Sequence, residues 1–373
     1  MKNLGSSTAL GKRLISLDLF RGLTMFLLIA EGRKFYDALS EMISQDSIFT
    51  GLIKNFYHHE WNGLHFWDLI QPYFMFIVGV AMVYSLNKRW DRGDTYAQTF
   101  KHIIRRCLIL FLFGVILHIG YKRELVFELW NVLVQLSFTI LVAFLIFRLP
   151  LLTQLLISIG LLILTELVYR LFPVIGYDQA FVIGNNFGSW MDMVLMGKIN
   201  PEGWVAINCV PTAAHTIWGV IVGKILMSKR GEMQKVKIIG LTGILGIFIG
   251  YTMDWTGITP IIKKICTSSF VIVSGGWALL TMAFFYWLID IKGYKRWTLF
   301  FTIVGMNSIF IYMFSGTIGG QWLNGYMMIY TNGFLSMLDA SAGFILLMNA
   351  LIVWAIEWLL CNWLYKQKVF FRI

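Results

Sequence analysis

Charged side chains are scarce in this sequence. Asp, Glu, Lys and Arg make up only 14% of the 373 residues, whereas hydrophobic residues make up 58% and aromatic residues 16%. This proportion leaves too few polar groups to cover the surface of a water-soluble globule of that size. The composition therefore argues against a soluble enzyme and predicts that much of the apolar surface faces lipid.

Cysteine is rare, and the common motifs of soluble enzymes are missing. The four cysteines lie in or beside apolar runs, with no CxxC pair and no histidine at metal-ligand spacing, so we expect neither a metal site nor a disulfide framework. There is no glycine-rich phosphate loop, nucleophile elbow or zinc motif. A strong internal repeat, which marks many secondary transporters, is also lacking. A transporter is therefore less favoured, but it is not excluded.

Apolar runs of about 18 or more residues recur along the whole chain, each long enough to cross the roughly 30 Å hydrocarbon layer as a helix. Backbone groups in lipid must be satisfied within their own segment, and runs of this length favour helices over barrel strands. We therefore predict an all-α, polytopic bundle of about ten spanning helices, forming a single domain over residues 1–373. The predicted spans are 14–32, 66–87, 103–120, 129–147, 150–171, 205–227, 236–252, 268–290, 298–316 and 341–365.

The distribution of positive charge indicates the orientation of the helices. The net charge of +11 does not indicate a nucleic-acid partner, because Lys and Arg gather in short segments between apolar runs, mostly on one side. This bias predicts a multi-pass protein of the inner membrane with both termini cytoplasmic. The first run has no convincing cleavage site after it and should remain as a helix. Asparagine and glycine interrupt residues 321–338, which we interpret as interfacial; if this segment crossed the membrane, the C-terminus would change sides.

Ionisable side chains at membrane depth are costly and favour a functional hypothesis. One group at the outer membrane boundary consists of His58, Glu60, Trp61, Asn62 and, at the start of the second span, Asp68. A histidine with an ordinary pKa of about 6.5 can take a proton from an attacking amine at neutral pH. If a helix began at His58, Asp68 would lie about 15 Å away along the axis, too far to orient the ring, and could instead pair with His65. Alternatively, the whole group only anchors a helix end.

Other polar residues allow both a functional and a structural interpretation. Arg21 could anchor an anionic ligand or form an ion pair with Asp18, three residues earlier on the same helix. Glu31 could assist the histidine or simply be solvated. Near the eighth and ninth spans, candidates for contacts with a buried ligand are Lys263, Ser269, Asn307 and Ser308. Such side chains also join helices to one another.

The chain also resembles the heparan-α-glucosaminide N-acetyltransferase family. The stretch RLISLDLFRG at residues 13–22 is similar to the opening motif of that family. Further similar stretches follow in the same order: HHEWNGL at 58–64, DLIQP at 68–72, FIVG at 76–79, PEG at 201–203, the spacing of Pro260, Lys263, Thr267 and Ser269, and GMNSI at 305–309. The resemblance covers essentially the whole chain, as expected for a bacterial member.

The resemblance implies transfer of acetyl from cytoplasmic acetyl-CoA, the co-substrate, to the amine of a glucosamine-type sugar on the periplasmic side. Its central histidine maps to His58 rather than His59, as a general base or as a covalent acetyl carrier. The acceptor-side or supporting residues would be Glu31, Glu60, Trp61, Asn62 and Asp68, and the acetyl-CoA contacts Arg21, Lys263, Ser269, Asn307 and Ser308. The implied partners are the lipid bilayer, the two substrates and a second copy of the chain, with no metal.

Two alternatives remain open at this stage. Glu31 stands where animal relatives have an asparagine, so a bacterial envelope sugar is as good an acceptor as heparan. A permease or binding protein for small glycans would use the same polar residues to line a pathway, and no bond would be made.

Overall fold

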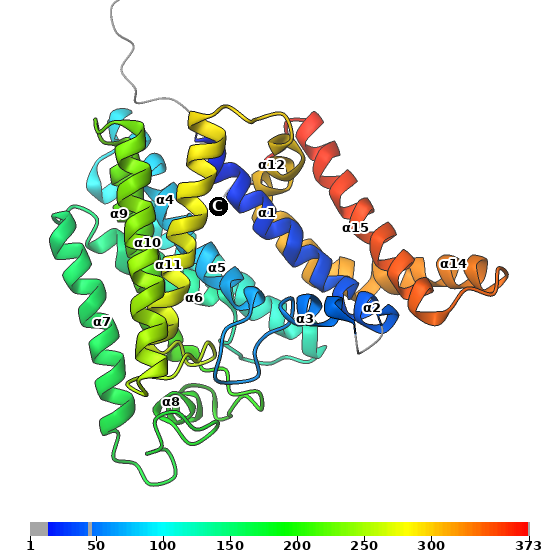
Figure 1. Ribbon diagram of the computed structural model, residues 1–373, viewed down its shortest axis with the longest axis horizontal. Coiled ribbons are helices and arrows are strands. Elements are labelled where there is room, and N and C mark those ends of the chain that lie inside the picture. Colours follow the sequence, from blue (N-terminus) through cyan, green and yellow to red (C-terminus); the bar gives the residue numbers. More distant parts are fainter. Residues whose placement is uncertain (1–13, 44–46, 372–373) are drawn as a thin grey trace, which may run out of the picture.

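The computed structural model describes residues 14–43 and 47–371, and this part of the chain is built from helices. Its one strand-like feature is an isolated antiparallel bridge between Asn62 and Ile262. The all-α prediction is therefore confirmed. Figure 1 shows α7, α9, α10 and α11 side by side in one half of the bundle, while α1 and α15 cross the other half obliquely.

All ten predicted spans correspond to helices. They are α1 (Ile15–Gly32), η2 with α4 (Phe66–Leu69 and Ile70–Asp91), α5 (Tyr96–Lys122), α6 (Val132–Leu145), α7 (Leu151–Leu171), η3 with α9 (Ala206–Asn208 and Cys209–Met227), α10 (Glu232–Trp255), α11 with η4 (Ser268–Phe285 and Tyr286–Ile291), α12 with α13 (Thr298–Met306 and Ser308–Phe314) and α15 (Ala342–Lys366). The connecting elements are α2 (Phe35–Met42), α3 (Ile48–Lys54), α8 (Phe187–Met196), η5 (Ser315–Leu323) and α14 (Asn324–Ser336).

Length and apolar composition mark the chain as a multi-pass membrane protein. Among the described residues, seven helices are long and apolar enough to cross a membrane, and a bent pair makes an eighth if it counts as one span. The other two predicted spans are α1, which carries Asp18, Arg21 and Glu31, and α6, which has only 14 residues. The three charged residues of α1 and the short length of α6 explain why these two helices are not counted among those long and apolar enough to cross a membrane.

Glycines allow the central helices α4 and α9 to touch. A Cβ atom on Gly79 would lie 2.1 Å from the carbonyl oxygen of Thr216, and one on Gly219 would lie 2.2 Å from that of Phe76. Small residues at such crossings let helices pack by van der Waals contact where lipid provides no hydrophobic driving force. The α4 helix is therefore fixed in position, and with it the polar residues at its start.

The ninth predicted span is bent rather than straight. The bend between α12 and the helical run from Ser308 to Ser336, which begins with α13, is 74°. Asn307, at the break, is fully buried. The Asn307 amide donates to the carbonyl of Val369 at 3.1 Å, and its oxygen accepts from the backbone N–H of Phe371 at 2.9 Å. The C-terminal tail thus returns to the bundle, where Val369 and Phe371 contact the break between α12 and α13.

The stretch 321–338, which we expected to be interrupted by asparagine and glycine, is largely helical. It belongs to a run of helix from Ser308 to Ser336 that passes through the π-helical η5. The Asn324 side chain accepts a hydrogen bond from Asn349 of α15 at 3.1 Å. This asparagine therefore joins two helices rather than ending one.

Candidate active site

Two loops meet in front of α4 and α11. Residues 55–65, the histidine loop, carry His58, and residues 256–267, the lysine loop, carry Lys263. The bridge between Asn62 and Ile262 joins the two loops. Residues more than 200 positions apart in sequence are thereby brought into one site.

His58 is held by a buried carboxylate. Its Nδ1 lies 3.0 Å from Oδ1 of Asp68, which is fully buried and also accepts backbone N–H groups of His59 at 3.2 Å and His65 at 2.9 Å. The expectation that Asp68 is too far from His58 and pairs with the His65 side chain is wrong. The helical segment begins only at Phe66, so the histidine loop folds back over the carboxylate.

Lys263 completes this arrangement. Its Nζ lies 2.8 Å from Nδ1 of His58 and 3.4 Å from Oδ1 of Asp68, and it sits 5.3 Å from the ring centroid of Trp204. The edge of the His58 ring meets the same indole at 5.7 Å. Lys263 is 4% exposed, whereas the His58 side chain is 39% exposed. His58 is therefore the accessible member of the three.

Burial and two neighbouring positive charges, those of Lys263 and Lys264, lower the pKa of His58 below its ordinary value of 6.5. Burial is the largest of these causes and Lys263 comes next, although Asp68 opposes them. Burial also lowers the pKa of Lys263 from its ordinary value of 10.5. His58 is accordingly neutral at pH 7. In the tautomer with the proton on Nδ1, that proton is directed at Asp68 and the lone pair lies on Nε2, where it can accept a proton or attack an acyl carbon. In the other tautomer Nδ1 accepts from Lys263 and Nε2 carries the proton, so Asp68 and Lys263 compete for the same ring nitrogen.

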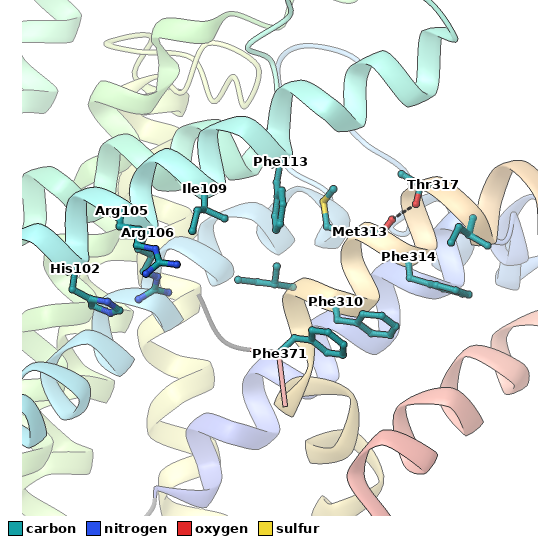
Figure 2. A pocket seen from close by; sticks show the side chains of 12 residues that line it. His102, Arg105, Arg106, Ile109, Phe113, Phe310, Met313, Phe314, Thr317 and Phe371 are labelled. Carbon is teal, nitrogen blue, oxygen red and sulfur yellow. Dashed lines mark hydrogen bonds between the residues drawn. The ribbon is translucent and has the colours of Figure 1, made fainter. Parts of the chain in front are cut away.

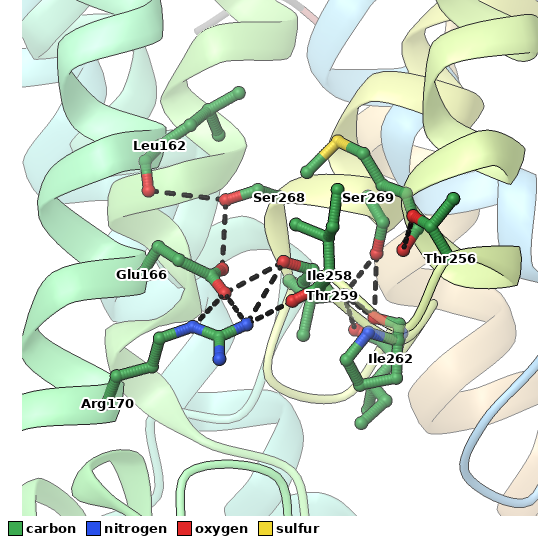
Figure 3. Close-up of polar contacts among 12 residues, drawn as sticks. Leu162, Glu166, Arg170, Thr256, Ile258, Thr259, Ile262, Ser268 and Ser269 are labelled. Carbon is green, nitrogen blue, oxygen red and sulfur yellow. Dashed lines mark hydrogen bonds and ion pairs between the residues drawn. The ribbon is translucent and has the colours of Figure 1, made fainter.

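The lysine loop is fastened to α7 by an acidic side chain (Figure 3). Oε1 of Glu166 accepts from Nε of Arg170 at 2.7 Å and from the hydroxyl of Thr259 at 2.8 Å, while Oε2 accepts from Ser268 at 3.3 Å. Arg170 also donates to the carbonyl of Ile258. These contacts bind both ends of the loop, so Glu166 helps to set the position of Lys263.

Ser269 belongs to the same loop anchor. Its hydroxyl and that of Thr267 each donate to the carbonyl of Pro260 at 2.7 Å, and Ser269 is fully buried. The structure therefore places this predicted acetyl-CoA contact inside the protein, away from the cavities. Its visible role is to close the lysine loop.

A cavity of about 170 Å³ opens in front of His58. Its lining includes Glu31, His58, Trp67, Gln71, Trp130, Gln135, Trp204, Lys263 and Tyr312. Glu31 accepts from Nε1 of Trp67 at 2.7 Å, and Gln135 donates to Asn208 at 2.6 Å. The surroundings of His58 thus combine flat aromatic faces with a few oriented polar groups, a common character of small-ligand sites.

Four of the five predicted acceptor-side residues do not line this cavity: Asp68, which holds His58 from behind, and three residues of the histidine loop. Trp61 donates to the carbonyl of Phe181 at 2.8 Å, and Asn62 forms the bridge between the loops. Glu60 is exposed on the histidine loop. In the described structure these residues shape or flank the loop, whereas Glu31 shares the cavity with His58.

A larger cavity of about 650 Å³ extends to the start of α1 and the end of α4, and its lining contains two of the predicted acetyl-CoA contacts, Arg21 and Ser308. Lys88 and Arg106 add positive charge to its lining, and the C-terminal tail contributes Phe371. The neighbouring Asn307 directs its side chain to the tail, as described above. Residues that line both this cavity and the His58 cavity are Phe74, Val132 and Tyr312.

Several residues at the site were not found from sequence. Trp204 packs against both His58 and Lys263, Gln135 lines the cavity from α6, and Glu166 fastens the lysine loop. Gln135 and Glu166 carried a usable signal, because both are polar side chains inside strongly apolar runs. Trp204 carried none, since aromatic residues are common throughout this chain.

The fold and the site define a multi-pass helical membrane protein with a neutral, carboxylate-held histidine facing a cavity. The chain is distantly related to the heparan-alpha-glucosaminide N-acetyltransferases. It is 21% identical to the human protein of that name (Homo sapiens) over 98% of this chain and 61% of the relative, and 22% identical to the mouse protein (Mus musculus) over 97% and 60%. The chain therefore spans about three fifths of the length of these curated relatives. No protein-family model matches it.

Proposed function

We propose that this protein is a membrane-embedded acetyltransferase. It takes acetyl from cytoplasmic acetyl-CoA and delivers it to the amine of a glucosamine-type sugar on the periplasmic side of the inner membrane. The observation that carries the proposal is the contact of His58 with Asp68 and Lys263 next to a cavity that adjoins a larger basic one. The distant relationship to named N-acetyltransferases supports the same reaction class.

In this proposal the larger cavity holds the donor. Arg21 supplies positive charge for the CoA phosphates, and Ser308 lies beside the path of the pantetheine arm. The excess of Lys and Arg in loops on one side supports a cytoplasmic position for this end. The 18 residues of α1 span about 27 Å, comparable to an extended CoA, so the thioester reaches His58 without a separate transport step.

The chemistry follows from a neutral histidine. In direct transfer, Nε2 of His58 takes a proton from the sugar amine while the nitrogen attacks the thioester carbon, a C–N bond forms, and the C–S bond breaks. The CoA thiolate then takes the proton from His58. In the covalent route, Nε2 attacks the thioester carbon and CoA leaves as the thiolate. The amine then attacks the acetyl carbon, the acetyl–Nε2 bond breaks, and the proton lost by the amine passes to the CoA thiolate. Asp68 stabilises the positive ring in either route.

The test is acetyl-CoA turnover by purified protein in liposomes, with and without glucosamine. We expect glucosamine-dependent release of CoA by the parent protein, and a loss of at least about 100-fold in His58→Ala, since a general base contributes about 10²- to 10⁴-fold. His59→Gln is the matched control, because His59 is adjacent but does not line the His58 cavity.

A glycan permease is the competing function, and the same samples distinguish it. If His58→Ala binds acetyl-CoA and has lost turnover, the acetyltransferase is supported. If the parent protein consumes no acetyl-CoA with any amino sugar but carries glucosamine oligosaccharides into liposomes, the acetyltransferase proposal is wrong and the cavities form a transport route.

A further inference from the structure

A third cavity, of about 660 Å³, lies between α5 and the α13–η5 helix, apart from the His58 cavity (Figure 2). It touches the donor cavity only through shared residues such as Arg106, Ile309 and Phe371. None of the residues assigned a role in the proposed transfer, namely His58, Asp68, Lys263, Arg21 and Ser308, lines it. The cavity therefore calls for a separate explanation.

One end of this cavity is positively charged. His102, Arg105 and Arg106 follow one another on α5 at spacings of three and four residues from the first, which places them on the same side of the helix. In Figure 2 the three side chains cluster at one end of the opening. Along the described chain, no Asp or Glu lines the cavity.

Arg106 also lacks a partner for part of its guanidinium group. Its Nε is buried and makes no hydrogen bond in the structure, and Arg21 adds a second positive charge nearby. A buried donor without an acceptor is costly, and two neighbouring cations repel each other. An anion with several acceptor oxygens would accept a hydrogen bond from the Arg106 Nε and would reduce the repulsion between the two cations. Arginine is well suited to phosphate because its planar group can donate two parallel hydrogen bonds.

The rest of the cavity is apolar. Ile109 and Phe113 continue along α5 from the basic end, and Met313 points toward Phe113 from the opposite helix (Figure 2). Phe310, Phe314 and Ile318 also line the cavity from that helix. From His102 to Phe113 the helix rises about 16 Å, roughly half of the 30 Å hydrocarbon layer. Ile318 is 49% exposed, so the apolar end is open at the surface of the bundle. Such a shape matches a molecule with one charged end and one hydrocarbon end.

We propose that this cavity binds an anionic phospholipid from the membrane. The phosphate lies against Arg105 and Arg106, and one acyl chain runs along Ile109 and Phe113. Basic pockets between spanning helices near the cytoplasmic surface recognise acidic headgroups in this way. Arg106 also lines the donor cavity, but Arg105, Ile109 and Phe113 line only this one, so the proposal can be tested apart from the acetyltransferase reaction.

The experiment measures lipid retained by the purified protein. Parent and variant proteins are exchanged into detergent with equal amounts of dioleoylphosphatidylglycerol and dioleoylphosphatidylcholine, and bound lipid is counted by native mass spectrometry. We expect the parent protein to retain phosphatidylglycerol preferentially, and Arg105→Gln with Arg106→Gln to reduce its affinity by about tenfold or more. Lys101→Gln is the matched control, since Lys101 is an exposed cation on the same helix outside the cavity.

A second variant keeps the test valid if the arginine variant does not fold. Ile109→Trp leaves every charge in place but fills the apolar part, and it should also reduce retention of phosphatidylglycerol. The proposal is wrong if the parent protein does not prefer phosphatidylglycerol, or if Lys101→Gln loses as much lipid as the double variant. It is also wrong if millimolar CoA or inorganic pyrophosphate displaces the lipid completely, because the basic end would then belong to the donor's phosphates.

Discussion

The Nζ atom of Lys263 lies 2.8 Å from Nδ1 of His58, and the two residues are 205 positions apart in the sequence. Lys263 comes from the lysine loop and His58 from the histidine loop, so the contact forms only when the two loops are joined. The buried ammonium group has Asp68 as its counter-charge at 3.4 Å. A cation placed so near the histidine favours the neutral ring, which is the form that base or nucleophilic chemistry requires.

The first prediction concerns Lys263→Gln and the pH dependence of turnover. The pKa of His58 is lowered from 6.5 by burial and by Lys263. Neutral His58 is the active form, so kcat/KM should fall as the pH drops through this pKa, and the acidic limb should lie below pH 6.5. Removing the positive charge of Lys263 raises the pKa of His58, so the acidic limb should move to higher pH.

The control for this variant is Lys264→Gln. Lys264 acts on His58 in the same direction but is the smallest of the causes, so the acidic limb should move less than in Lys263→Gln. Equal shifts in both variants, or a shift to lower pH in Lys263→Gln, would contradict the assigned role of Lys263.

The second prediction concerns Asp68→Asn. The amide keeps the size of the carboxylate but cannot stabilise a positive His58 ring or hold the proton on Nδ1 by charge. We expect kcat to fall by about 10²- to 10⁴-fold, while acetyl-CoA still binds because Asp68 does not line the donor cavity. Equilibrium binding and single-turnover rates separate these two effects. Asp178→Asn, at an exposed loop position, should leave both unchanged.

Much of the fold could be predicted from the lengths of apolar runs. All ten predicted spans correspond to helices, because a run of about 18 apolar residues in lipid has few alternatives to a helix. The bend at Asn307 could not be predicted in this way. It depends on the C-terminal tail returning to supply two backbone partners for one buried amide, and hydropathy carries no information about such a return.

The site was predicted less completely than the fold. The choice of His58 stays a prediction, and the structure places it in a cavity with Glu31, which the sequence also suggested. The relation of His58 to Asp68 was missed because their separation was considered only for a helix that begins at His58, although the predicted span began at residue 66 and left His58 in a loop. The helical segment begins at Phe66, where the Asp68 carboxylate accepts the backbone N–H of His65 at 2.9 Å. An acidic residue in the first helical turn is a recognisable start signal, whereas the position of Lys263 depends on a loop pairing that no local pattern records.

The third prediction concerns Tyr312, which lines both the donor cavity and the His58 cavity. Removing the ring in Tyr312→Ala should connect the two spaces more widely and admit water to the thioester. We expect acetyl-CoA hydrolysis without an acceptor to rise relative to transfer by about tenfold, or 1.4 kcal/mol, and propionyl-CoA to become a better donor. Tyr312→Phe keeps the ring and should behave like the parent protein. An unchanged ratio of hydrolysis to transfer in Tyr312→Ala would show that the ring does not separate the cavities.

The last prediction concerns Glu166, a positioning residue that does not line the His58 cavity. It accepts hydrogen bonds from Arg170, Thr259 and Ser268, and thereby fastens both ends of the lysine loop. In Glu166→Ala these donors lose their shared acceptor, and Lys263 should be held less closely against His58. Turnover should fall by about tenfold, which corresponds to 1.4 kcal/mol of transition-state stabilisation.

A general loss of stability would also lower turnover, so the informative measurement is again the acidic limb of kcat/KM. If Glu166 acts through Lys263, the limb should move to higher pH in Glu166→Ala, in the same direction as in Lys263→Gln. The double variant Glu166→Ala with Lys263→Gln should then move the acidic limb no further than Lys263→Gln alone, because both changes remove the same influence on His58. Glu124→Ala, at an exposed loop position, should leave the limb in place. A lower turnover with an unmoved limb would mean that Glu166 only stabilises the fold.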